Sequence, residues 1–262
     1  MSAIILTDEI VHYEVLGRGR PVIFLHGWVG SWRYWIPAMQ SASISFRAYA
    51  LDLWGFGDTA KVAARYPLEQ QAKLVELFLD GMGIGKVALV GHGLGALAAA
   101  LYAARSPDSV DRLMLIALPT SEGSLNPRLR QAMLVELTDW LLPRAAATAA
   151  VRDEASKADA HALQTSLVPL QPFFQAETFP RLRVPYMWVH GAADPLIFEP
   201  RPEILAALPE SAHFIAFEQS GHFPMLDEAS KFNRLLADFL ALGSGESPRQ
   251  LQLKEEWRRR VR

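Results

Sequence analysis

The stretch KVALVGHGLGALAAALYA, residues 86–103, contains the features that decide the fold. Its first part, Val87 to Val90, is apolar throughout, which is typical of a strand buried on both faces. Its second part, from Leu94 onward, is rich in alanine and leucine, which are strong helix formers. Gly91 and Gly93 lie between the two parts, and Gly95 follows at the start of the second part. The stretch therefore predicts a strand that turns sharply into a helix, the repeating unit of alternating α/β folds.

The rest of the chain repeats this alternation. Short apolar runs predict strands at residues 21–27, 46–53, 86–91, 112–118, 184–191 and 212–218, and helical patterns cover residues 68–82, 94–105, 202–208 and 226–242. Such an order indicates a doubly wound, mostly parallel sheet with right-handed crossovers. Residues 3–19 predict an antiparallel hairpin at the edge of that sheet.

Residues 121–180 break the pattern, because no convincing strand occurs in them. Residues 129–142 are amphipathic and predict a helix, and further helical segments follow. About 60 helical residues are more than a crossover needs, so we predict an inserted helical cap. The predicted division is a core of residues 1–120 and 181–242, a cap of residues 121–180, and a linker with a basic tail at 243–262. The tail indicates either a solvated helix or a segment that docks on an anionic partner.

Composition excludes several classes of function. The formal net charge of −2 over 262 residues gives no whole-protein field for nucleic acid, and the absence of cysteine excludes disulfides, thiolate metal sites and a cysteine nucleophile. The first residues lack the basic and apolar regions of a signal peptide. No apolar run reaches the length of about 18–20 residues that crosses a bilayer. We therefore expect a cytoplasmic protein with no membrane span.

Four polar segments follow predicted strands at their carboxyl ends, where open α/β sheets bind ligands. They are FLHGWVGSW (24–32), GHGLG (91–95), HGAADPL (190–196) and SGHFPMLDE (220–228). The third places Asp194 just after a late strand, and the fourth places His222 before the last helix. The carboxyl ends of parallel strands share one edge of the sheet, so we expect these segments to meet.

Together with DLWGFGDT (52–59), these motifs and their order resemble the α/β-hydrolase fold with a helical cap, and the resemblance covers about residues 10–242. It implies a nucleophile position at residue 93, a base at His222 and an acid, Asp194, that orients the base. It implies an oxyanion hole formed by the N–H groups of Trp28 and Leu94. It also implies that a substrate is bound by His26, Gly27, Trp28, His92 and Trp140. Phe173 and Phe174 line a roof over the site or only pack the cap.

The sequence departs from this family at one decisive position, because Gly93 stands where the nucleophile is expected. Glycine has no side chain to attack a carbonyl. His92 leaves the strand toward another face, and we interpret Ser31 as a helix N-cap rather than a replacement. Epoxide hydrolases and haloalkane dehalogenases carry aspartate at this turn, so they are disfavoured. The spacing of GHGLG also disfavours a dinucleotide site.

Three functions stay open. The first and favoured one is a serine-hydrolase scaffold for a small apolar ester or acyl ligand, without its nucleophile through natural loss or engineering, and so inactive or strongly impaired. The second is an enzyme in which His222 and Asp194 act as a general-base dyad on water or substrate. The third is a non-catalytic protein that binds a small ligand. We expect no cofactor, and no metal, because the histidines lack ligand spacing.

Overall fold

A computed structural model describes residues 2–168, 182–243 and 246–253. Its centre is an eight-stranded sheet with the order β1-β2-β4-β3-β5-β6-β7-β8. Strands β3 to β8 are mutually parallel, and β1 and β2 form an antiparallel hairpin at one edge, as predicted. The strands are β1 Ser2–Leu6, β2 Glu9–Gly17, β3 Arg20–Leu25, β4 Phe46–Leu51, β5 Val87–His92, β6 Val110–Ile116, β7 Tyr186–Gly191 and β8 Ala212–Phe217.

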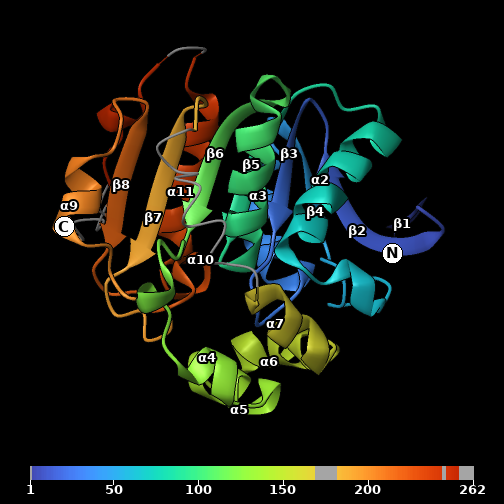
Figure 1. Ribbon diagram of the computed structural model, residues 1–262. Helices are drawn as coiled ribbons and strands as arrows, with labels where there is room; N and C mark the ends of the chain where they lie inside the picture. Colours follow the sequence, from blue (N-terminus) through green and yellow to red (C-terminus); the bar gives the residue numbers. More distant parts are fainter. Residues whose placement is uncertain (1, 169–181, 244–245, 254–262) are drawn as a thin grey trace, which may run out of the picture.

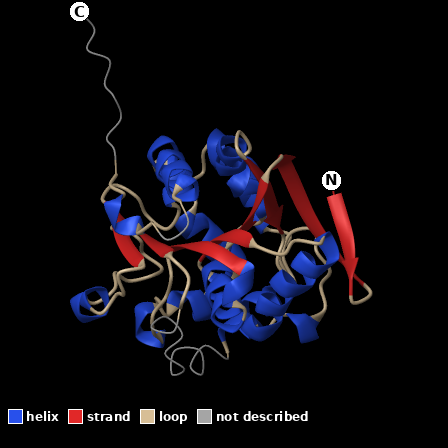
Figure 2. Cartoon of the chain, turned by 90° about the horizontal axis from the view of Figure 1, so that it is seen from above, coloured by secondary structure: helices blue, strands red, loops and turns tan. Residues whose placement is uncertain are grey.

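Helices cover both faces of the sheet (Figures 1 and 2). Helices α2 and α3 pack on each other over one face, and α1 and α11 pack together over the opposite face. The helices outside the stretch between β6 and β7 are α1 Ile36–Ala42, α2 Leu68–Met82, α3 Leu94–Arg105, α9 Pro202–Ala206, α10 Pro224–Asp227 and α11 Ala229–Ala241. The predicted α/β architecture, a mostly parallel doubly wound sheet, is confirmed.

Helix α3 is rich in alanine and packs on the centre of the sheet. Residues 94–103 are all buried, because the helix packs on three strands and on α2. Small side chains let the helix approach these neighbours closely, while the leucines fill the remaining space. This packing holds the start of α3 rigidly at the carboxyl end of β5.

Among the described residues between β6 and β7, four helices lie at the carboxyl end of the sheet (Figure 1). They are α4 Arg128–Gln131, α5 Leu134–Leu141, α6 Ala146–Ala155 and α7 Ala160–Leu167. The single helix predicted over residues 129–142 is wrong in detail, because Ala132 and Met133 are extended and separate α4 from α5. Phe173 and Phe174 lie outside the described residues.

Two other predictions need correction near the carboxyl terminus. The helix predicted over residues 226–242 is divided at Glu228 into α10 and α11. The part of the tail that the structure describes is docked rather than free. The Arg249 guanidinium donates hydrogen bonds to the carbonyl groups of Leu208, Pro209 and Ala212, at the start of β8.

Candidate active site

Gly93 forms the turn that joins β5 to α3. Its backbone has φ 51° and ψ −110°, a conformation that side-chain-bearing residues adopt only at a cost. The Gly93 N–H donates to the carbonyl of Ile116 at 2.9 Å, and its own carbonyl accepts from Leu97 at 3.1 Å. A β-carbon on Gly91 or Gly95 would overlap neighbouring backbone atoms. Residue 93 is therefore held on a sharp turn that only small flanking residues permit.

Asp194 and His222 form a buried hydrogen-bonded pair. The Nδ1 atom of His222 lies 2.9 Å from Oδ2 of Asp194, and both side chains are almost inaccessible to solvent. The other carboxylate oxygen, Oδ1, accepts from the backbone N–H groups of Leu196 at 2.8 Å and Ile197 at 3.1 Å. Burial by itself would raise the pKa of Asp194, but His222 and these two N–H groups outweigh it and lower the pKa. The carboxylate is therefore ionised and orients the imidazole.

The second ring nitrogen of His222 makes no hydrogen bond to the described part of the protein. Within the described part of the chain, this Nε2 atom is buried and has no hydrogen-bond partner. The loop that carries the ring is fixed from behind, because the Gly221 N–H donates to Asp227 at 2.9 Å and the Ser220 hydroxyl donates to Glu228 at 2.7 Å. A buried imidazole nitrogen without a hydrogen-bond partner lowers the stability of a fold, so such an atom indicates a functional role.

The N–H groups of Trp28 and Leu94 are free of protein acceptors among the described residues. The Nδ1 atom of His26 donates to the carbonyl of Gly27 at 2.8 Å, while Nε2 of the same ring accepts from the Leu53 N–H at 3.0 Å. The Gly27–Trp28 peptide is planar, so a bond to its carbonyl also fixes the direction of the Trp28 N–H. That these two N–H groups meet at one oxygen atom of a ligand stays a prediction.

His92 connects the two sides of the site through a chain of hydrogen bonds. Its Nε2–H donates to the His222 carbonyl at 2.9 Å, and its Nδ1 accepts from the Tyr34 hydroxyl, also at 2.9 Å. The Tyr34 oxygen in turn accepts from the Gly27 N–H at 2.7 Å. Burial and the neighbouring His222 hold the pKa of His92 well below its ordinary value, so the ring is neutral. Tyr34 was missed in the sequence because nothing in its spacing links it to residue 92.

The predicted site residues are only partly brought together. Asp194 is bonded to His222, and the rings of His92 and His222 lie 4.5 Å apart between centroids. The ring nitrogens of His26 and His92 are occupied within the protein, so these histidines act on the backbone around the site. Trp140 lies on α5, half-buried, with the Arg128 guanidinium 4.6 Å from its ring centroid. Its contact with a ligand stays a prediction.

Ser31 accepts a hydrogen bond from the Arg33 N–H at 3.2 Å and begins a short 3-10 helix over Trp32–Trp35, which confirms its interpretation as an N-cap. Among the described residues, one group of side chains has the spacing of a metal site, namely His12, Asp52 and Asp58. Asp52 already accepts from the His12 ring at 2.8 Å and from the Trp32 and Asp58 N–H groups. No helix in the described ranges is long and apolar enough to span a membrane.

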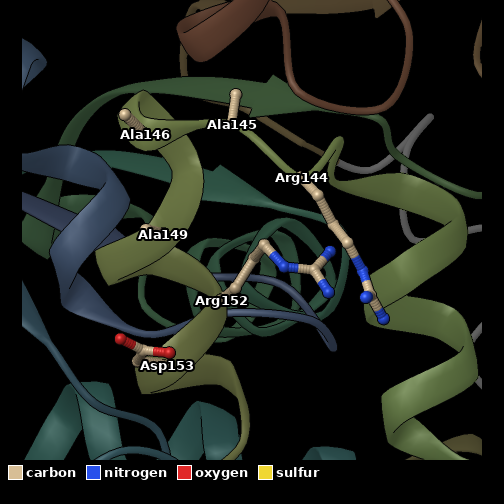
Figure 3. A pocket seen from close by; sticks show the side chains of 6 residues that line it. All are labelled: Arg144, Ala145, Ala146, Ala149, Arg152 and Asp153. Carbon is tan, nitrogen blue, oxygen red and sulfur yellow. The ribbon is translucent and has the colours of Figure 1, made fainter.

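A hollow beside α6 shares none of its lining residues with this site. It is lined by side chains of α6 and the turn before it, including Arg144 and Arg152 (Figure 3). The Arg152 guanidinium donates to the carbonyls of Thr138 and Leu142, and both arginines pair with Asp139. These arginines therefore hold α5 and α6 together.

Comparison with known proteins gives a consistent result. Residues 22–235 match the sequence model of the Alpha/beta hydrolase family. The putative carbamate hydrolase RutD of Stutzerimonas stutzeri is 26% identical over 90% of this chain and 98% of its own length. The pimeloyl-[acyl-carrier protein] methyl ester esterase of Vibrio campbellii is 24% identical over 88% of this chain and 98% of its own.

The fold is also shared with solved structures. A variant of the N-acyl homoserine lactonase AidH, in which a serine is replaced by glycine and which holds N-hexanoyl homoserine lactone, superposes with a TM-score of 0.79. It is 19% identical in sequence, and the match covers 91% of this chain and 96% of that one.

Proposed function

The chain belongs to the alpha/beta hydrolase family, and we propose that it is a serine-hydrolase-type scaffold for small apolar esters or related acyl compounds in which Gly93 takes the place of the nucleophile. The observation that carries the proposal is the His222 ring, bonded to Asp194 and buried, with a free Nε2 atom. In a serine hydrolase this atom takes the proton of the attacking hydroxyl. Here that proton donor is absent, so hydrolysis is strongly impaired.

The conformation of residue 93 supports this assignment. A nucleophile turn holds its middle residue in a strained backbone geometry between a strand and a helix. Gly93 has positive φ at the junction of β5 and α3, and the unused N–H of Leu94 follows directly. With the Trp28 N–H this gives an oxyanion hole that a glycine at position 93 leaves intact. Removal of a triad serine leaves roughly 10³–10⁴-fold catalysis over water in subtilisin.

The relatives support the ligand class. One is named as a methyl ester esterase and another as a putative carbamate hydrolase. The AidH variant with glycine in place of serine holds an N-acyl lactone. A protein of this fold with glycine in place of a serine can therefore hold an acyl ligand. We infer the same for this chain, with helices of residues 121–180 acting as the cap over the core of residues 1–120 and 181–242.

The variant Gly93→Ser tests the proposal. We expect it to hydrolyse short and medium acyl esters and to be labelled at residue 93 by a fluorophosphonate, detected by mass spectrometry, because His222 and the two N–H groups are already in place. The variant Gly93→Ser, His222→Gln keeps the new hydroxyl and removes the base, and we expect no labelling. A folded Gly93→Ser protein that neither hydrolyses esters nor takes the label would overturn the proposal.

The free Nε2 atom of His222 also favours a second candidate function. In it, a water molecule attacks the carbonyl carbon while His222 takes its proton and returns it to the leaving alcohol, with no covalent intermediate. The unaltered protein would then hydrolyse an ester with His222 as its base. Loss of that activity in His222→Gln favours this candidate. An affinity for the ester without turnover favours a binding protein.

A further inference from the structure

The indole of Trp28 lies between Gly93 and the cap. Trp28 follows β3 in the loop that carries the predicted oxyanion donor, and its side chain has no solvent exposure. Its Nε1–H donates to the Ser166 hydroxyl at 3.0 Å. Ser166 is on α7, is itself fully buried, and donates its hydroxyl proton to the Leu163 carbonyl at 2.9 Å. A residue of the site loop is thus bonded directly to a cap helix.

The benzene ring of this indole faces residue 93. A β-carbon on Gly93 would lie 3.2 Å from Cε3 and 3.3 Å from Cζ3 of Trp28, with the Gly27 α-carbon 3.6 Å away. Carbon atoms pack best at about 3.5–4.0 Å, so both ring contacts are too close. A hydroxyl group on that β-carbon would need further space. Any side chain at position 93 therefore requires the indole to move.

The indole is poorly able to move. The main chain at one end of Trp28 is held by the His26 bond to the Gly27 carbonyl. At the other end, a shift of the ring stretches the bond from Nε1 to Ser166 inside a region closed to water. A buried N–H without its acceptor costs more than an ordinary hydrogen bond contributes.

We propose that Trp28 and Gly93 are a matched pair: while Ser166 anchors the indole to α7, any side chain at residue 93 is strained against the indole, which is the wall that a bound acyl group meets there. Trp28 is then a specificity-determining residue of the site. The role of Trp28 as a wall for an acyl group rests on the proposed function. The steric pairing of residues 28 and 93 rests only on the contacts of the indole.

The test compares labelling rates in four proteins that all carry Gly93→Ser. The second also carries Trp28→Leu, the third Ser166→Ala, and the fourth Trp188→Leu. Trp188 is a buried indole on β7 that packs on Phe214, so its loss is a matched control for volume. In the labelling step, the serine oxygen attacks phosphorus of the fluorophosphonate, the P–F bond breaks, fluoride leaves and the hydroxyl proton passes to Nε2 of His222.

We expect Trp28→Leu to raise the labelling rate of Gly93→Ser about tenfold, because a tenfold change in rate needs only a small relief of strain. We expect Ser166→Ala to raise the rate less, and Trp188→Leu to leave it unchanged. Equal rates in all four proteins would overturn the inference while supporting the proposed function.

If no folded variant is labelled, the proposed function is contradicted. A second measurement then still tests the steric pairing of residues 28 and 93. Gly93→Ala adds only a β-carbon and needs no chemistry. We expect its effect on the folding equilibrium constant, from urea unfolding, to be about tenfold smaller in the Trp28→Leu background than in the unaltered chain. An equal effect in both backgrounds would show that the two positions are not coupled and would overturn the inference.

Discussion

A single hydroxyl group, that of Tyr34, joins the loop before Trp28 to the loop of His222. It accepts from the Gly27 N–H at 2.7 Å and donates to His92 at 2.9 Å. Its complete burial raises its pKa well above the ordinary value, so it stays a donor. Replacement by phenylalanine leaves two buried polar groups without partners. We expect Tyr34→Phe to lower the free energy of unfolding by about 1–3 kcal/mol in urea denaturation.

Tyr186 provides the control for this prediction. It is also buried, but among the described residues its hydroxyl has no hydrogen-bond partner, and burial raises its pKa to about 12. Tyr186→Phe removes a desolvated group that contributes nothing, so we expect no loss of stability or a small gain. Equal losses in the two variants would show that the Tyr34 hydroxyl is not a special connection.

Only some residues of the candidate site could be predicted from the sequence. Gly93, Asp194 and His222 could be located because each follows an apolar run, and the carboxyl ends of parallel strands share one edge. Tyr34 and Ser166 could not be found in this way. They contact residues 58 and 138 positions away, respectively, in the chain, and such distances leave no periodic signal. The roles predicted for His26 and His92 also depended on where their ring nitrogens point.

Helix α7 is fixed to the core at its first turn. Asp159 is its N-cap and accepts from the His161 N–H at 2.9 Å, while its second oxygen accepts from the Tyr66 hydroxyl at 2.6 Å. These bonds, that of Tyr66 first, outweigh burial and lower the pKa of Asp159. Its own N–H donates to the Gly55 carbonyl at 2.8 Å. One residue thus caps the helix and joins it to two core loops.

We expect Asp159→Ala to lower the free energy of unfolding by about 2 kcal/mol, because it removes both the cap and the acceptor for Tyr66. Asp159→Asn keeps an oxygen for the cap, so its loss should be clearly smaller. Lys157→Gln removes the ion pairs of a partly exposed lysine with Asp58 and Glu154, and it should change stability by less than Asp159→Ala does. Urea unfolding measures all three, and equal values for the alanine and asparagine variants would contradict the assignment.

Element boundaries could be predicted best where packing is regular. The predicted bounds of α2 and α3 agree with the structure, because each presents a long buried stripe to the sheet. The bounds of the helices between β6 and β7 were harder to predict. The break between α4 and α5 contains neither proline nor glycine, so local sequence does not mark it. Helix α1 was missed, since its seven residues are too few for a helical period to be evident.

At the scale of the whole molecule, the sheet and the helices packed on it enclose most of the histidines. Burial lowers the pKa of His26, His92, His190 and His213, against a nearby carboxylate in some cases. His12 is the exception. Burial also disfavours its charged form, but the bond to Asp52 and the neighbouring carboxylates outweigh burial and raise its pKa. The fold as a whole therefore favours neutral imidazoles, which bears on its response to acid.

These directions predict that acid weakens the fold. A histidine with a lowered pKa binds its proton more readily in the unfolded chain, so stability falls as the pH decreases below about 6.5. Each such group contributes at most about 1.4 kcal/mol per pH unit, and His12 acts in the opposite direction. We expect urea unfolding to give a lower free energy at pH 5.5 than at pH 7.5. His92→Gln should reduce this difference. A free energy that is constant or rises toward pH 5.5 would show that the buried histidines are not held neutral.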